Sequence, residues 1–191
     1  PLSAKIHSRI LRLFPFDLTP FQTEVCDEIA ADMARDTPMN RLLQGDVGAG
    51  KTVVAAFAML LCVAHGYQSA MMAPTEVLAR QHARSLRQLL NQSPVRIDTM
   101  FGSDTPSQRA ALLDRIPAEE VDLLVGTQAL AHAAESGKMS LRRLGLVIID
   151  EQHKFGVKQR SMLKQAGAAP HYLVMTATPI PRTLTMTLFG D

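Results

Sequence analysis

A short glycine-rich sequence in this chain ends in a lysine and a hydroxyl residue. Residues 45–52 read Gly-Asp-Val-Gly-Ala-Gly-Lys-Thr, which fits the phosphate-loop pattern G-x-x-x-x-G-K-[ST]. Glycines let consecutive backbone N–H groups face phosphate oxygens, and the positive end of a following helix adds to the attraction. The Lys51 ammonium can then neutralise β- and γ-phosphates, and the Thr52 hydroxyl can ligate Mg²⁺. The pattern predicts a site for ATP with Mg²⁺, lined by Gly45, Asp46, Val47, Gly48, Ala49, Gly50, Lys51 and Thr52.

Two adjacent carboxylates end an apolar run further along the chain. Residues 146–149 are Leu-Val-Ile-Ile, and Asp150 and Glu151 follow. Ligands bind at the carboxyl ends of strands in parallel sheets, so Asp150 can hold Mg²⁺ while Glu151 orients and deprotonates an attacking water. A glycine-rich turn and an acidic strand end each have an ordinary structural explanation, but together they favour one hydrolytic site. We therefore predict Glu151, Lys51 and Asp150 as catalytic residues.

The segments that must position these residues alternate between strand-like and helix-like patterns. Runs rich in branched residues predict strands at 41–44, 68–73, 95–100, 121–125, 144–149 and 172–176. Helical patterns lie between them, at 51–64, 76–90, 106–115 and 159–165, with a last one after Pro181. The run 144–149 is apolar on both faces, as in a strand buried inside a parallel sheet. The alternation predicts an α/β fold, a doubly wound, mainly parallel sheet with helices on both faces.

The first residues follow another pattern. Apolar residues repeat there at helical spacing: Ile6, Ile10 and Leu13. After an interruption, Thr19 followed by Pro20 predicts the start of a second helix. We interpret residues 1–15 as a lead-in helix or linker from an upstream domain, and 16–191 as the ATP-binding domain.

Composition sets limits on partners and location. Of the 191 residues, 47% are hydrophobic and 20% charged, which is ordinary for a globular domain with a packed core. The net charge is only +2, so affinity for DNA must come from a local patch. Cys26 and Cys62 lie in apolar helical patterns and are expected to be buried free thiols. The longest apolar run, 53–64, is shorter than the ~20 residues of a bilayer span, so we expect a cytoplasmic protein with no membrane partner.

The tetrad Asp-Glu-Gln-His at 150–153 resembles motif II of the superfamily 2 helicases. Other segments resemble further motifs of that family in the same order: 16–22 the glutamine motif, 73–76 and 81–82 motif Ia, 101–103 and 126–127 the DNA-backbone motifs, and 176–178 motif III. The resemblance implies a RecA-like domain of the P-loop NTPases in which Gln22 reads the adenine edge. It also implies DNA contacts, or coupling between ATP and DNA, at Thr75, Gly102, Ser103, Thr127, His153, Thr176 and Thr178.

The flanking sequences narrow the resemblance. Residues 150–156 and 175–183 are similar to the RecG family of bacterial branched-DNA helicases, whereas the related transcription-repair coupling translocases usually carry glutamate in place of Gln152. RecG-like proteins remodel stalled forks and Holliday junctions with the help of an N-terminal wedge domain and a second RecA-like domain, which supplies an arginine finger. The resemblance implies that this chain is the first motor domain of such a helicase and works at the bacterial nucleoid. On its own, we expect it to bind nucleotide or DNA without turnover.

Three positions depart from the family pattern. Ala49 replaces a serine, which is a small-for-small change, and Phe101 stands where threonine is usual. Lys154 replaces an arginine, and a lysine cannot pair with a carboxylate or phosphate in the bidentate geometry of arginine. A small-molecule kinase of the P-loop class is the other enzyme considered, and it would lack both the tetrad and the Thr-Ala-Thr run at 176–178.

Overall fold

The computed structural model describes residues 4–45, 50–139, 143–150 and 170–176 of the chain. Within them, six strands form one sheet: β1 (Asn40–Gln44), β2 (Gln68–Met72), β3 (Ile97–Met100), β4 (Leu123–Gly126), β5 (Leu144–Asp150) and β6 (His171–Thr176). The helices described are α1 (Ala4–Leu13), α2 (Pro20–Met33), α3 (Lys51–Ala64), α4 (Glu76–Leu89), α5 (Pro106–Arg115) and α6 (Gln128–Glu135). None of these helices is long and apolar enough to cross a membrane.

The sheet has the order β1-β6-β5-β2-β4-β3, and every pairing among the described strands is parallel. Parallel pairing puts the carboxyl ends of all these strands at one edge of the sheet. β1 and β5, which precede the two predicted chemical motifs, are separated only by β6. The fold therefore gathers at one edge residues that lie far apart in the sequence.

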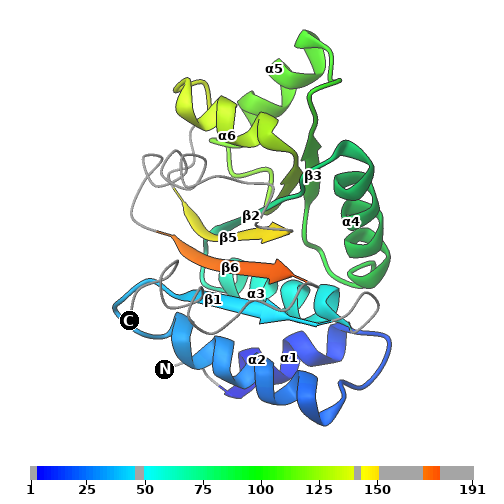
Figure 1. Ribbon diagram of the computed structural model, residues 1–191, viewed down its shortest axis with the longest axis vertical. Helices are drawn as coiled ribbons and strands as arrows, with labels where there is room; N and C mark the ends of the chain where they lie inside the picture. Colours follow the sequence, from blue (N-terminus) through cyan, green and yellow to red (C-terminus); the bar gives the residue numbers. More distant parts are fainter. Residues whose placement is uncertain (1–3, 46–49, 140–142, 151–169, 177–191) are drawn as a thin grey trace.

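Each face of the sheet is covered by helices, which confirms the predicted doubly wound architecture. Because successive strand residues point to opposite faces, β5 contributes to two cores. Leu146 and Ile148 pack with side chains of α1, α2, α3 and α4, whereas Val147 and Ile149 pack with side chains of α5 and α6. Figure 1 shows α1 and α2 beyond β1 at one end of the molecule, and α5 and α6 near the opposite end.

Both cysteines lie in the core on the α3 side of the sheet, as predicted, and both are free. Burial, with a smaller contribution from Asp27, raises the pKa of the Cys26 thiol to about 12. Burial also raises the pKa of the Cys62 thiol to about 11, although hydrogen bonds with Ser69 and the Gly145 backbone act in the opposite direction. At neutral pH both groups are therefore uncharged thiols.

Most predicted elements are confirmed within the described residues. α3 and α5 have the predicted bounds, and the six strands lie within two residues of theirs at either end. Helix α6 was not predicted, because a short alanine-rich stretch directly after 126–127 offers no long apolar stripe. The predicted helices at 159–165 and after Pro181 lie outside the described residues.

Local sequence determines where two of the helices begin. Thr19 caps α2 and Thr105 caps α5, and in each case a proline occupies the first turn. In both helices the side-chain oxygen of the glutamine three residues after the threonine accepts a hydrogen bond from the threonine N–H, which completes a capping box. The predicted helix start at Thr19 and Pro20 is thus confirmed.

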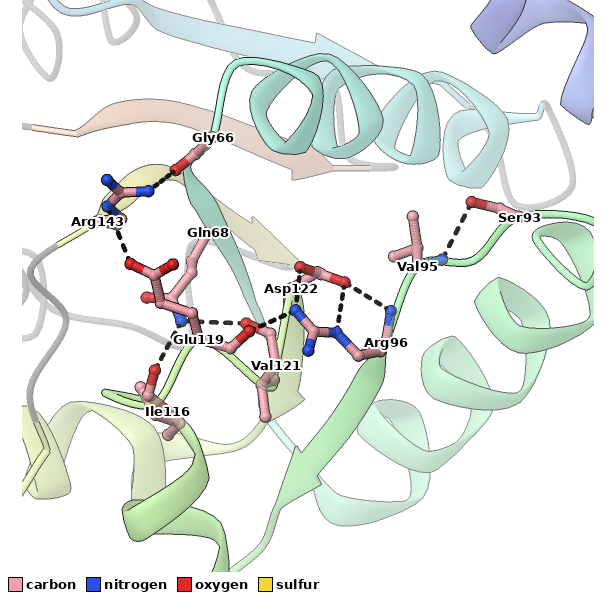
Figure 2. Close-up of polar contacts among 10 residues, drawn as sticks. All are labelled: Gly66, Gln68, Ser93, Val95, Arg96, Ile116, Glu119, Val121, Asp122 and Arg143. Carbon is pink, nitrogen blue, oxygen red and sulfur yellow. Dashed lines mark hydrogen bonds and ion pairs between the residues drawn. The ribbon is translucent and has the colours of Figure 1, made fainter.

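A cluster of polar side chains holds the loops at the amino ends of the strands, opposite the edge formed by the carboxyl ends (Figure 2). The Arg96 guanidinium, just before β3, donates to the carboxylate of Asp122 and to the carbonyl of Glu119. The amide of Gln68, at the start of β2, donates to the carbonyls of Ile116 and Val121 at 3.1 and 3.0 Å. These bonds fix the loop between α5 and β4, so that edge has a structural role.

Candidate nucleotide and metal site

The phosphate loop leaves the carboxyl end of β1 and ends in the first turn of α3. The Gly45 N–H donates to the carbonyl of Thr176, 3.1 Å away, which ties the start of the loop to β6. Lys51 is the first residue of α3, and its Nζ donates to the Gly45 carbonyl at 2.7 Å. The ammonium therefore reaches back across the loop, beside the helix N-terminus that would attract phosphate.

Position 50, the last of the loop, requires glycine for two reasons: its backbone conformation and the close approach of the Gln22 side chain. Its φ of 81° lies in the left-handed region, and a Cβ built on it would lie 2.1 Å from Nε2 of Gln22. The Gln22 amide is oriented by the α2 cap, because its Oε1 accepts from the Thr19 N–H at 2.9 Å. The structure thus places Gln22 against the end of the phosphate loop, while adenine recognition by Gln22 stays a prediction.

Asp150 is the last residue of β5 and is only 8% exposed. It is in register with Met175 of β6, one residue before the Thr176 that holds the loop. Its Oδ2 lies 2.6 Å from Nε2 of His82, on α4. The two predicted motifs therefore follow strands that only β6 separates. A histidine not predicted as a site residue, His82, contacts the second motif at Asp150.

The donors at this edge fit magnesium. Mg²⁺ keeps several waters and is usually held by one or two protein oxygens together with the phosphates of a nucleotide. The Thr52 hydroxyl in the first turn of α3 and the Asp150 carboxylate are two such oxygens. Within the described residues, no three His, Cys, Asp or Glu side chains are grouped to bind a metal without a nucleotide. This donor set suits Mg²⁺ bound together with ATP.

The predicted DNA-side residues that are described lie at the carboxyl ends of β2, β3, β4 and β6. Thr75 and Thr127 cap α4 and α6, accepting from the N–H groups of Leu78 and Ala129. Gly102 follows β3 with open space around its Cα, whereas Thr176 is buried at the end of β6. The structure gives all of these residues positions and gives Thr75 and Thr127 helix-capping roles, while their contacts with DNA stay predictions.

Around Ser103, side chains of α4 and the segment after β3 form one network. The Ser103 hydroxyl donates to Glu76 Oε1 at 2.8 Å, and Arg80 donates to the same oxygen at 2.7 and 3.0 Å. Hydrogen bonds from Ser103 and Arg80 lower the pKa of the Glu76 carboxyl. The Arg80 guanidinium lies 4.2 Å from the centre of the Phe101 ring, which is buried. Phe101 therefore packs under an arginine, a contact that its sequence position gave no means of predicting.

Several predicted site residues lie outside the described residues: Asp46, Val47, Gly48, Ala49, Glu151, His153 and Thr178. Of the described ones, the structure brings together Gln22, Gly45, Gly50, Lys51 and, through β6, Asp150. His82 is the addition. In the sequence, Gln81 and His82 only resemble part of a helicase motif, and no spacing rule links position 82 to position 150.

Comparison with known proteins places this chain among helicases. Residues 19–187 match the family model described as DEAD/DEAH box helicase. The ATP-dependent DNA helicase RecG of Bacillus subtilis is 49% identical over 183 residues, which are 96% of this chain and 26% of that protein. RecG of Synechocystis is 50% identical over 179 residues, or 94% of this chain and 21% of that protein. This chain spans about a quarter of the length of these curated relatives.

Solved structures show the same similarity. A structure of RecG bound to a three-way DNA junction matches all of this chain with a TM-score of 0.82 at 37% identity, and the match covers 25% of that chain. The yeast DEAD-box splicing factor Prp28 matches 92% of this chain, and 44% of its own, with a TM-score of 0.69 at 17% identity. The latter likeness shows the fold alone.

Proposed function

Since this chain belongs to the DEAD/DEAH box helicase family, we propose that it is the ATP-binding motor domain of a RecG-type helicase that remodels branched DNA. One observation carries the proposal: Gly45, which starts the phosphate loop, and Asp150 lie at the carboxyl edge of one parallel sheet, and both adjoin β6. That arrangement suits phosphoryl transfer from ATP to water. The proposal that the DNA substrate is branched rests on the resemblance to RecG.

In this proposal each residue has one task. Backbone N–H groups of the loop and the Lys51 ammonium bind the β- and γ-phosphates, while Thr52 and Asp150 hold Mg²⁺, which neutralises charge on the phosphates. Glu151 accepts a proton from the attacking water, whose oxygen forms the new bond to the γ-phosphorus as the bond to ADP breaks. Gln22 binds the adenine edge.

The proposed partners follow from the same resemblance. The solved structure of RecG bound to a three-way DNA junction supports branched DNA as the substrate class. Within that class we propose stalled forks and Holliday junctions. A wedge domain and a second RecA-like domain of the same polypeptide are proposed to grip the junction and to supply the arginine finger. Action on chromosomal DNA would take place in the cytoplasm, at the nucleoid.

The ATPase rate of the full-length protein, with a fork, a Holliday junction or linear duplex, tests the proposal. We expect branched DNA to stimulate hydrolysis more than linear duplex does. Equal stimulation by both would instead favour the transcription-repair coupling translocases.

Glu151→Gln tests the hydrolytic residue in the same assay. An amide is nearly the same shape but cannot accept the proton, so ADP should bind as before while turnover stops. Near wild-type turnover in this variant would assign the base to another residue.

A further inference from the structure

The carboxylate of Asp150 is held by a histidine from a distant part of the chain. Nε2 of His82 lies 2.6 Å from Oδ2 of Asp150, although the residues are 68 positions apart. A carboxylate only accepts hydrogen bonds, so this nitrogen carries the hydrogen. The side chains of His82 and Asp150 are 16% and 11% exposed, so this hydrogen bond is largely shielded from water.

The histidine is itself held by a packed helix. The α4 residues Ala79, Ala83 and Leu86 are buried, and α4 packs against β3, β4 and α3. His82 directly precedes Ala83, so its ring lies at the border of that buried face. Two turns earlier, Thr75 caps the start of α4, at the edge where DNA contacts are predicted. The position of Asp150 Oδ2 is therefore tied to a rigid element outside the nucleotide-binding loop.

We infer that His82 is a positioning residue for the metal-binding carboxylate. Its hydrogen bond engages Oδ2 and so fixes the rotation of the Asp150 side chain that would hold Mg²⁺. This inference rests on the proposed function, because it takes Asp150 as the metal ligand. Carboxylates that ligate metals are commonly fixed by such outer hydrogen bonds, and loss of the outer partner typically costs ~10–100-fold in metal affinity or activity.

A purely structural tie between α4 and β5 is the competing explanation. It predicts lower stability after loss of the hydrogen bond, with no change in the Mg²⁺ dependence of nucleotide binding. A positioning role predicts instead that nucleotide binding needs more Mg²⁺ when the hydrogen bond is lost. The Mg²⁺ requirement should go back to the wild-type value when another side chain restores an N–H donor at position 82. Glutamine and methionine have similar lengths, and only glutamine carries an N–H donor. His82→Gln and His82→Met therefore form a matched pair.

The experiment measures binding of a fluorescent ADP analogue to the full-length protein while Mg²⁺ is titrated. We expect His82→Met to raise the Mg²⁺ concentration for half-maximal binding by ~10-fold or more, and His82→Gln to stay close to wild type. His132→Met, an exposed histidine on α6, controls for the loss of an imidazole and should leave the titration unchanged. Thermal unfolding of each variant checks that it is folded.

A double-mutant cycle with Asp150→Asn adds a second readout. If His82 acts through Asp150, then His82→Met should have little further effect on the Mg²⁺ titration once Asp150 is replaced. Equal Mg²⁺ requirements for folded His82→Met, His82→Gln and wild type would overturn the inference and leave the proposed function intact. Nucleotide binding by the wild type that needs no Mg²⁺ would instead remove the metal site, and both proposals with it.

Discussion

Lys51 is the side chain on which phosphate binding should depend most. Its Nζ already lies 2.7 Å from the Gly45 carbonyl, so the ammonium stands at the loop before any phosphate arrives. Hydrogen bonds to charged groups are worth ~1.5–3 kcal/mol, which corresponds to ~10–100-fold in affinity. Lys51→Ala is therefore expected to weaken ADP–Mg²⁺ binding by that factor in calorimetric titrations. The exposed Lys138→Ala matches the loss of charge elsewhere, and equal affinities for both variants would contradict the assignment.

At the scale of elements, the junction of the phosphate loop with α3 and α2 depends on the missing side chain at Gly50. Gly50→Ala adds left-handed strain of ~1–2 kcal/mol, and its Cβ also displaces the Gln22 amide. Gly137→Ala is a matched control, since its φ is 71° but a Cβ there would meet nothing within 4 Å. Both variants should lose similar stability from strain in chemical denaturation, whereas only Gly50→Ala should also lose ADP affinity.

Equal ADP affinity in the two glycine variants would show that the approach of Gln22 to the loop has no bearing on the nucleotide. A loss of stability confined to Gly50→Ala would have another meaning. It would assign the cost to the contact with Gln22, and not to the left-handed backbone.

The β1–β6 pairing is predicted to weaken in acid because of His171. Its Nδ1 accepts from the Met39 N–H at 2.8 Å, and burial lowers the pKa of this imidazole below its ordinary value of 6.5, against a smaller opposing effect of Asp32. A lowered pKa means that the unfolded chain takes up the proton first. The contribution to stability is therefore complete above pH 6.5 and is lost as the pH falls below it.

Denaturation curves between pH 7.5 and 5 test this window. Wild type should lose on the order of 1 kcal/mol, the usual net value of one hydrogen bond, beyond what His171→Asn loses, because the asparagine oxygen can accept without titrating. His132→Asn, at an exposed position, should follow wild type. Parallel curves for wild type and His171→Asn would assign the acid sensitivity to other groups.

The positions of helices and strands could be predicted from the sequence more completely than the contacts between distant side chains. Continuous apolar runs located β5 and α3, because burial on both faces of a strand, or nearly all round a helix, leaves a clear pattern in the sequence. No such run marks α6, whose eight residues are held by the Thr127 cap and by packing on the sheet. The contacts of His82 with Asp150 and of Arg80 with Phe101 could not be predicted, because they depend on the order in which strands and helices are laid side by side.

For the whole molecule, the proposed mechanism predicts nucleotide binding without rapid turnover by this chain alone. An arginine finger contributes ~10³–10⁵ in rate to P-loop enzymes, and the resemblance assigns it to a second RecA-like domain. The ATPase rate of the isolated chain should therefore stay near background with or without a DNA fork. DNA-stimulated hydrolysis by this chain that disappears in Arg182→Ala would show that the finger is supplied in cis.

The two buried cysteines have a practical consequence for measuring motion in this domain. Maleimides react with thiolates, and Cys26 and Cys62 are both buried, with pKa values raised to about 12 and 11. Neither should be modified at pH 7 while the fold persists. A single cysteine introduced at an exposed position such as Gln88 on α4 would then take up one dye, without prior removal of the native thiols. The fluorescence of that dye would then report on the surroundings of α4 as nucleotide binds.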